Sequence, residues 1–224
     1  DHGIIAVQGP RSAEVLAAVG LPTEQDYMAM ASAQFQGSPV IVCRTGYTGE
    51  HGYELVAPTA VLVALWDAVV AEARERGGMP AGLGARDTLR TEMGYPLHGQ
   101  DISPTITPVM AMLGWAIGWD KATFRGRDAL QAQREAGPSH RLRGLLALDR
   151  GIPRAHMQVR RGALDGPLVG EVTSGTFSPT LKQGIALALL DSSVAVDDEV
   201  IVDVRGRESR FRVVKPPFVQ ASTR

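Results

Sequence analysis

The residues best suited to chemistry lie in one glycine-rich stretch, Arg44 to Glu54, which reads Arg-Thr-Gly-Tyr-Thr-Gly-Glu-His-Gly-Tyr-Glu. Glycine recurs at every third position from Gly46 to Gly52, with tyrosines and glutamates beside it. Glycine adopts backbone angles closed to other residues and lets a ligand or another backbone approach closely. Such a loop, leading into an apolar strand, could hold a flat polar molecule. A tight hairpin with spare tyrosines explains the pattern equally well.

Glu54 is the first candidate for contacting such a molecule, because it begins an apolar strand just after the loop and its side chain could face inward. An ionised carboxylate accepts hydrogen bonds only, and it can take two N–H groups side by side. An amino-pyrimidine edge, as in guanine or a pterin, offers that pair of donors. The alternative is an exposed carboxylate at the edge of a sheet, the usual surroundings of glutamate.

Arg86 is the second candidate. It falls in the N-terminal half of an expected helix, beside Asp87. The planar guanidinium suits a carboxylate ligand. A salt bridge to Asp87 or Glu92 is the competing interpretation, and spacing alone favours it.

Other kinds of site find no support in the sequence. The five histidines are scattered without a paired ligand spacing, so we expect no metal site. Cys43 is the only cysteine, which excludes an internal disulfide and a thiolate-rich metal site. There is no Gly-x-Ser-x-Gly elbow, and the glycine repeat is not a phosphate-binding fingerprint because no helix follows it directly.

The charge of the chain argues against two classes of partner. With a formal net charge of -1 over 224 residues, no overall field attracts nucleic acid or a membrane surface. We find neither a secretory signal nor an apolar run long enough to span a bilayer, and therefore expect a cytoplasmic protein. Residues 121–161 hold ten Lys or Arg and three acidic residues, a local balance of +7. That stretch is either a solvated face or a surface for an acidic partner.

The elements that position these residues form two parts. Residue periodicity predicts strands at 4–8, 28–35, 39–44 and 53–56, and helices at 11–19, 59–76, 83–93 and 128–135. After residue 137 it predicts short strands at 142–148, 157–161, 168–173, 185–190, 200–204 and 211–214. We therefore predict an α+β fold, with antiparallel sheets and helices in a first domain at 1–137 and a small C-terminal β-barrel at 138–224.

The glycine-rich stretch closely resembles the signature of the T-protein family, the aminomethyltransferases of the glycine cleavage system. Further matching segments occur in the same order along the chain: Val7–Pro10, Gly82–Arg90, Pro96–Asp101, Leu113–Trp115, Phe124–Arg127, Gly170–Pro179 and Pro217–Val219. The resemblance spans essentially the whole chain, and chance does not produce so many ordered matches.

Members of this family transfer the methylene of an aminomethyl group, carried on the lipoyl arm of a partner protein, to tetrahydrofolate and release ammonia. The resemblance therefore implies tetrahydrofolate as co-substrate, the lipoylated carrier protein (H-protein) as partner and a folate-binding domain at 1–137. By position in the motifs, Tyr47 would line the pterin site, Glu54 would hydrogen-bond the pterin ring and Arg86 would pair with the glutamyl tail. Tyr27 matches a further cavity position.

The chain also departs from the family pattern. The family's N-terminal portion is absent, and with it the aspartate thought to orient folate and to assist attack by its N5 nitrogen. No residue of this chain is assigned that catalytic role, so we expect a fragment without normal activity. His98 stands where a tyrosine is frequent, and the chain ends in residues 220–224 where some relatives place a folate-contacting Tyr or Arg.

Three alternatives stay open beside this interpretation. The chain could belong to another tetrahydrofolate-dependent enzyme on the same scaffold, such as a demethylase or the folate domain of an amine oxidase. It could be a non-catalytic folate-binding protein of iron–sulfur-cluster maintenance, but that branch carries a cysteine in the glycine loop and residues 44–54 contain none. It could also be a fold fragment that binds no ligand.

Overall fold

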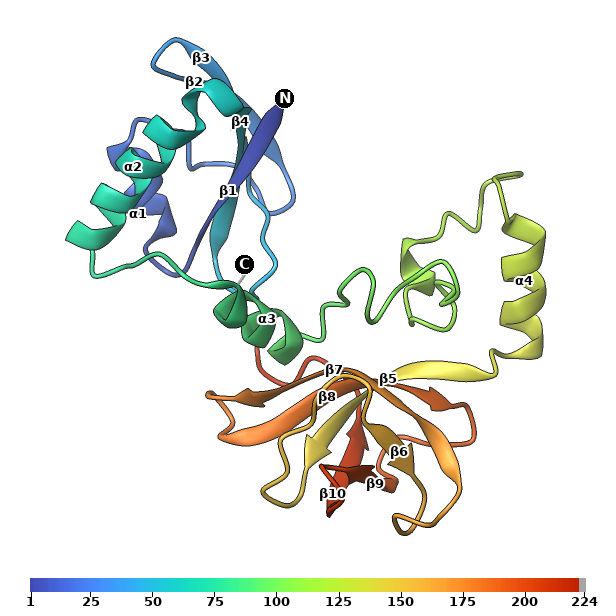
Figure 1. Ribbon diagram of the computed structural model, residues 1–224. Coiled ribbons are helices and arrows are strands. Elements are labelled where there is room, and N and C mark those ends of the chain that lie inside the picture. The colour runs from blue at the N-terminus through green and yellow to red at the C-terminus, as the bar shows by residue number, and fades with distance from the viewer. Residues whose placement is uncertain (222–224) are drawn as a thin grey trace. The chain divides into compact units, whose positions relative to one another are not determined.

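The computed structural model describes residues 1–221, so Ser222, Thr223 and Arg224 of the chain end lie outside the described residues. The chain folds into two compact units, Asp1–Leu89 together with Gln220 and Ala221, and Arg90–Val219 (Figure 1). The domain boundary expected at residues 137 and 138 stays a prediction. No helix within residues 1–221 is long and apolar enough to cross a membrane.

The first unit is a four-stranded antiparallel sheet with helices on one face. Its elements are β1 (His2–Gln8), α1 (Ser12–Ala18), β2 (Met30–Phe35), β3 (Ser38–Cys43), β4 (Gly52–Pro58) and α2 (Thr59–Glu75), and α3 (Leu83–Glu92) begins at its end. The strands lie in the order β1-β4-β3-β2, so β4 is an inner strand between β1 and β3. The predicted strands and helices of this part are confirmed, with ends shifted by a few residues.

Alternating burial explains how β4 is oriented. Tyr53, Leu55 and Ala57 are buried in the core between the sheet and helices α1 and α2, which lie on the same face (Figure 1). Because successive side chains of a strand point to opposite faces, Glu54 and Val56 must face away from that core. Leu16 on α1 and Leu65 on α2 are fully buried against the same cluster.

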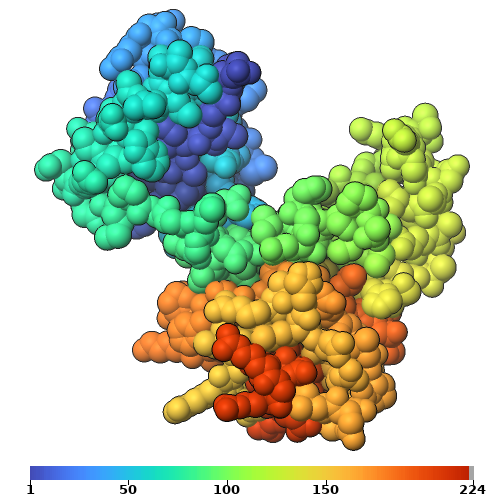
Figure 2. Space-filling model, viewed as in Figure 1, coloured from blue at the N-terminus to red at the C-terminus, as the bar shows by residue number. Residues whose placement is uncertain are grey.

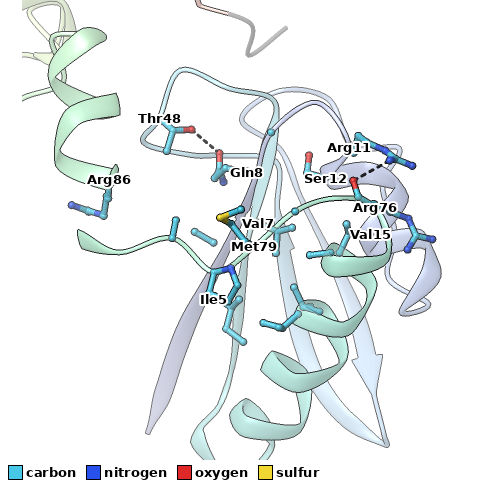
Figure 3. A pocket seen from close by; sticks show the side chains of 18 of the residues that line it. Ile5, Val7, Gln8, Arg11, Ser12, Val15, Thr48, Arg76, Met79 and Arg86 are labelled. Atoms are coloured by element: carbon cyan, nitrogen blue, oxygen red, sulfur yellow. Dashed lines mark hydrogen bonds between the residues drawn. The ribbon is translucent and has the colours of Figure 1, made fainter. Parts of the chain in front are cut away.

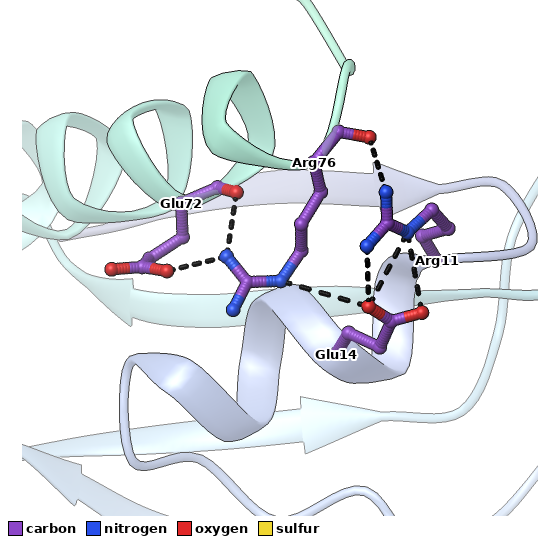
Figure 4. A network of polar contacts seen from close by, with 4 residues as sticks. All are labelled: Arg11, Glu14, Glu72 and Arg76. Atoms are coloured by element: carbon purple, nitrogen blue, oxygen red, sulfur yellow. Dashed lines mark hydrogen bonds and ion pairs between the residues drawn. The ribbon is translucent and has the colours of Figure 1, made fainter.

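An ion network joins the start of α1 to the end of α2 (Figure 4). Arg11 Nη2 lies 2.8 Å from Glu14 Oε2, and Arg76 Nη1 lies 2.5 Å from Glu72 Oε2. Arg11 Nη1 also donates to the carbonyl oxygen of Arg76 at 3.0 Å. The hydrogen bond from Arg11 lowers the pKa of the Glu14 carboxyl. The side chains of Arg11 and Glu14 are half exposed, so their pair contributes little to stability.

The second unit is a closed six-stranded antiparallel barrel preceded by irregular chain. Before the barrel come a 3₁₀ turn η1 (Gly114–Ala116) and α4 (Arg127–Ala136). The strands are β5 (His140–Ala147), β6 (Gln158–Arg160), β7 (Leu168–Ser178), β8 (Gln183–Asp191), β9 (Glu199–Asp203) and β10 (Glu208–Val214), in the order β10-β5-β8-β7-β6-β9. The barrel residues, coloured yellow to red, pack as one body in Figure 2. The predicted α+β class with a C-terminal barrel is confirmed.

Strand β7 is longer than predicted. The prediction ended at residue 173 because apolar and polar residues do not alternate in the second half of the strand. Ser174, Thr176 and Ser178 are all buried, yet each carries a hydroxyl. Ser174 Oγ donates to Asp101 Oδ2 at 2.8 Å, and Ser178 Oγ donates to Glu92 Oε1. The strand therefore continues over polar partners that come from residues 90–101, which a hydrophobic pattern does not detect.

A buried ion pair lies at the centre of those contacts. Arg90 Nη1 and Asp101 Oδ2 are 2.7 Å apart, and neither side chain has any exposed surface. Thr173 Oγ1 donates to Asp101 Oδ1 at 2.5 Å, and the amide of Leu97 donates to Oδ2 at 2.8 Å. These bonds attach the segment after α3 to the barrel within the second unit.

Candidate functional site

A cavity of about 500 Å³ opens in the first unit, and three of the four predicted ligand-binding residues line it. Tyr47 comes from the glycine loop, Glu54 from β4 and Arg86 from α3. In Figure 3, Arg86 lies at one end of the cavity and Arg11 and Arg76 lie at the other. The wall between them is mainly apolar, with Ile5, Val7, Val15 and Met79 among its residues (Figure 3). Ile5, Val7 and Val15 belong to the core on the helix side of the sheet, whereas Glu54 reaches the cavity from the opposite face. A mainly apolar wall with a few polar groups is typical of a small-molecule site.

Arg86 and Tyr47 are in direct contact. The guanidinium carbon of Arg86 lies 4.6 Å from the centre of the Tyr47 ring, within the range of a cation–π interaction. The contact joins the glycine loop to the start of α3. Glu92, one proposed salt-bridge partner of Arg86, instead accepts hydrogen bonds from Ser178 and Thr180 in the barrel unit.

Glu54 is neither at a sheet edge nor fully exposed. It is half-buried on the inner strand β4, where it pairs with Ala6 of β1 and Cys43 of β3. Thr45 Oγ1 donates to Glu54 Oε2 at 2.5 Å, while Oε1 accepts no hydrogen bond from a described residue. The alternative of an exposed edge carboxylate is therefore wrong. One oxygen of the carboxylate is thus engaged with the loop, and the residue lines the cavity.

The two interpretations of the glycine loop turn out to be compatible. Residues 44–51 connect β3 to β4, which pair antiparallel, so the loop is a hairpin connection. The same loop supplies Tyr47 and Thr48 to the cavity wall. Gly49 has φ +78°, a conformation that L side chains rarely adopt, which accounts for a glycine at this position.

Tyr53, the second tyrosine of the glycine-rich stretch, has a structural role. Tyr53 is almost completely buried, and its hydroxyl donates to the carbonyl oxygen of Thr23 at 2.8 Å. The guanidinium of Arg44, itself buried, lies 5.2 Å from the centre of the Tyr53 ring and donates to the carbonyl oxygen of Gly52 at 3.0 Å. Burial raises the pKa of the Tyr53 hydroxyl. This tyrosine fastens the loop to the core and does not face the cavity.

Tyr27, the fourth predicted residue, lies in the turn before β2 and does not line the cavity that holds the other three. The amide of its neighbour Met28 donates to the carbonyl oxygen of Arg44 at 3.0 Å, so the turn lies beside the start of the glycine loop. The role of Tyr27 stays a prediction.

His51 ties the loop to helix α1. Ser12 Oγ lies 2.9 Å from His51 Nδ1 and donates to the carbonyl oxygen of His51 at 3.2 Å. Desolvation by burial, with a smaller contribution from the positive charge of Arg44, lowers the pKa of His51. The folded state therefore favours the neutral imidazole.

This lowered pKa predicts a pH dependence of stability. The unfolded chain binds a proton at His51 more readily than the folded chain, so stability rises with pH between the folded pKa and about 6.5, the value expected in the unfolded chain. The contribution is lost as the pH falls through the folded pKa. We expect the urea midpoint of the His51→Gln variant to change less than that of the parent between about pH 5 and 7. Equal changes in both proteins would contradict the assignment, and an NMR titration of the His51 ring checks the pKa directly.

Gln8, whose side chain forms hydrogen bonds with the glycine loop, was not predicted as a functional residue. Gln8, the last residue of β1, was visible only as part of the segment Val7–Pro10, and its type carries no signal of its own. In the structure its side-chain amide contacts three residues of the glycine loop or its exit, and it lines the cavity (Figure 3).

Two further expectations concern metals and charge. Among residues 1–221 no three His, Cys, Asp or Glu side chains lie close enough together to hold a metal ion.

In the basic stretch, residues 121–161, Arg127, Arg154 and Arg160 donate to backbone carbonyl oxygens of the second unit. Arg134 stacks over the ring of Trp119 at 4.7 Å. These contacts engage four of the ten basic side chains within the unit, and both interpretations of the stretch stay predictions.

Comparison with known proteins agrees with both units. Residues 1–121 match the family described as the GCVT N-terminal domain, and residues 140–220 match the glycine cleavage T-protein C-terminal barrel domain. The aminomethyltransferase of Parafrankia sp. (strain EAN1pec) is 60% identical over 224 residues, covering 100% of this chain and 61% of that protein. The aminomethyltransferase of Mycobacterium avium (strain 104) is 59% identical over 226 residues, with the same coverage of both proteins.

A solved structure has the same fold. The glycine cleavage system aminomethyltransferase T from Bartonella henselae superposes with a TM-score of 0.89 at 34% sequence identity, covering 99% of this chain and 60% of that one. The chain thus spans about three-fifths of the length of the relatives it matches. The family matches extend over most of the chain, and they place it in the glycine cleavage T-protein family.

Proposed function

We propose that this chain supplies the folate-binding loop and the barrel of a glycine cleavage aminomethyltransferase. In the proposed reaction, the methylene of an aminomethyl group on a lipoyl arm passes to tetrahydrofolate, and ammonia is released. The observation that carries the proposal is the meeting of Tyr47, Glu54 and Arg86 in one cavity of about 500 Å³. Family membership and relatives named aminomethyltransferase support it.

The geometry fits a folate in three ways. The free oxygen of Glu54 can accept N–H donors of the pterin edge, since Thr45 occupies only Oε2. The Tyr47 ring offers a flat wall in the same cavity. Arg86, whose guanidinium stacks on the same ring, can pair with a carboxylate of the glutamyl tail.

The proposed role of these residues is to position folate and to exclude water. Folate N5 and then N10 each exchange a proton for a bond to the aminomethyl carbon. The C–N and C–S bonds of that carbon break, and the two protons complete the released ammonia and the thiol of the lipoyl arm. The methylene ends bonded to N5 and N10 of folate. Holding the two reactants in one dry cavity keeps the carbon from escaping as formaldehyde. No residue of this chain is assigned to the proton transfers.

Titration calorimetry with 5-formyltetrahydrofolate, a stable folate, tests the binding part of the proposal. We expect saturable binding by the 224-residue chain and at least tenfold weaker binding by the Arg86→Ala variant, because an ion pair to the tail is lost. Asp165→Ala, a change on a barrel-unit loop, is the control. Binding that Arg86→Ala leaves unchanged would contradict the assigned orientation.

The reaction is tested by release of ammonia from an aminomethylated, lipoylated carrier protein in the presence of tetrahydrofolate. We expect little release by this chain alone, because no residue here was matched to the family's aspartate; near-normal turnover would refute that. Methylated amines and thioethers as substrates distinguish the demethylase alternative. The carrier protein as partner and a cytoplasmic location remain proposals, which pull-down with purified carrier and cell fractionation test.

A further inference from the structure

The side-chain amide of Gln8 forms hydrogen bonds with three residues of the glycine loop or its exit. Nε2 donates to the carbonyl oxygen of Tyr53 at 3.0 Å and to that of Thr45 at 3.3 Å. Oε1 accepts from Thr48 Oγ1 at 3.3 Å, the bond drawn in Figure 3. Both N–H groups of the amide are thus engaged by carbonyl oxygens on the two sides of the loop.

Two of the three loop glycines owe their identity to this amide. A Cβ at Gly46 or at Gly52 would lie 2.2 Å from Gln8 Oε1, and the three atoms nearest to either Cβ all belong to the Gln8 amide. Neither glycine has a φ in the left-handed region, unlike Gly49. The backbone alone would therefore accept alanine at both positions. The space that the two missing side chains leave is filled by Gln8.

Three short routes lead from Gln8 to the candidate ligand-binding side chains, two to Glu54 and one to Tyr47. Thr45, whose carbonyl oxygen accepts from Gln8, donates from its hydroxyl to Glu54 Oε2 at 2.5 Å. Tyr53, whose carbonyl oxygen accepts from Gln8, immediately precedes Glu54. Thr48, which donates to Gln8, immediately follows Tyr47. The amide therefore fixes the chain on both sides of Glu54 and next to Tyr47.

We propose that Gln8 is the positioning residue of the folate loop, holding Glu54 and Tyr47 in the arrangement that binds the pterin. This rests on the proposed function, since the ligand is the folate of that reaction. Gln8 acts through the loop: it presents no free donor to the ligand, because both of its N–H groups are bonded to the loop.

Gln8→Glu is the sharpest test, because it keeps the shape and replaces two donors by lone pairs that face two carbonyl oxygens. We expect the affinity for 5-formyltetrahydrofolate to fall at least tenfold and hydrogen exchange of the amides at 45–53 to speed up at least tenfold. Gln25→Glu, a half-buried glutamine outside the loop, is the matched control and should change either value less than twofold. Parent-like affinity and exchange in Gln8→Glu would overturn the proposal.

A double-mutant cycle tests the fit between Gln8 and the glycines without any ligand. Gly46→Ala should speed loop exchange at least tenfold in the parent and less than threefold in the Gln8→Ala background, because the obstacle to the new Cβ is gone. Equal effects in both backgrounds would overturn the proposal. If the parent chain bound no folate while this coupling was present, the proposed function would fail for the chain and the positioning by Gln8 would stand.

Discussion

Replacing Asp101 by Ala is expected to destabilise the second unit by about 3–5 kcal/mol, the usual result of breaking a buried ion pair from one side. The change leaves the Arg90 guanidinium with no exposed surface and without its carboxylate at 2.7 Å. It also removes the acceptor of Thr173, Ser174 and the Leu97 amide. Urea unfolding followed by circular dichroism measures the loss of free energy.

The exposed pair of Arg210 and Asp149 provides the control. Its nitrogen and oxygen are 3.2 Å apart, but the side chains are 57% and 41% exposed. Asp149→Ala should therefore cost less than about 1 kcal/mol. The double variant Arg90→Met, Asp101→Leu should recover part of the loss, because apolar residues of similar volume often replace a buried pair without penalty. If Asp101→Ala cost no more than Asp149→Ala, the ion pair would not hold the segment to the barrel.

Replacing Glu54 by Ala is expected to weaken folate binding by about 10–100-fold, since a hydrogen bond to a charged group contributes about 1.5–3 kcal/mol. The cost in stability should stay small, because Glu54 is half-buried and its one described partner is the Thr45 hydroxyl. Calorimetry with 5-formyltetrahydrofolate gives the affinity, and urea unfolding gives the stability.

Two comparisons sharpen the Glu54 result. Glu54→Gln keeps the size of the side chain and removes its charge, so it should bind folate more weakly than the parent. Glu24→Ala, an exposed glutamate outside the cavity lining, should leave the affinity unchanged. Unchanged affinity of Glu54→Ala in a chain that does bind folate would refute contact between Glu54 and the pterin.

Much of the fold follows from local patterns. The apolar stripe of residues 59–75 and the alternation in residues 53–57 predict α2 and β4 because each element buries one face against the same core. The strands of the barrel follow from short β runs broken by Gly and Pro. The end of β7 does not, because Ser174 and Ser178 are buried against a carboxylate each and not against apolar side chains.

The candidate site divides in the same way. Sequence reasoning found Tyr47, Glu54 and Arg86 through their motifs, and the structure brings the three into one cavity wall. It placed Tyr27 with them, although Tyr27 does not line that cavity. It left Glu54 open between an edge position and an inward one, which strand order decides: β4 lies between β1 and β3.

The sequence by itself determined the element types, the barrel and the glycine loop, because hydrophobic periodicity and glycine spacing act over a few neighbouring residues. Only the tertiary structure decided why the glycines are there. Gly49 has a left-handed backbone conformation, whereas Gly46 and Gly52 make room for Gln8, which lies 38 and 44 positions earlier in the chain. Likewise, the partner of Arg90 became visible only when Asp101 and Ser174 met it in the interior. Contacts between distant residues depend on how sheets and barrels close, and residue patterns carry no record of that closure.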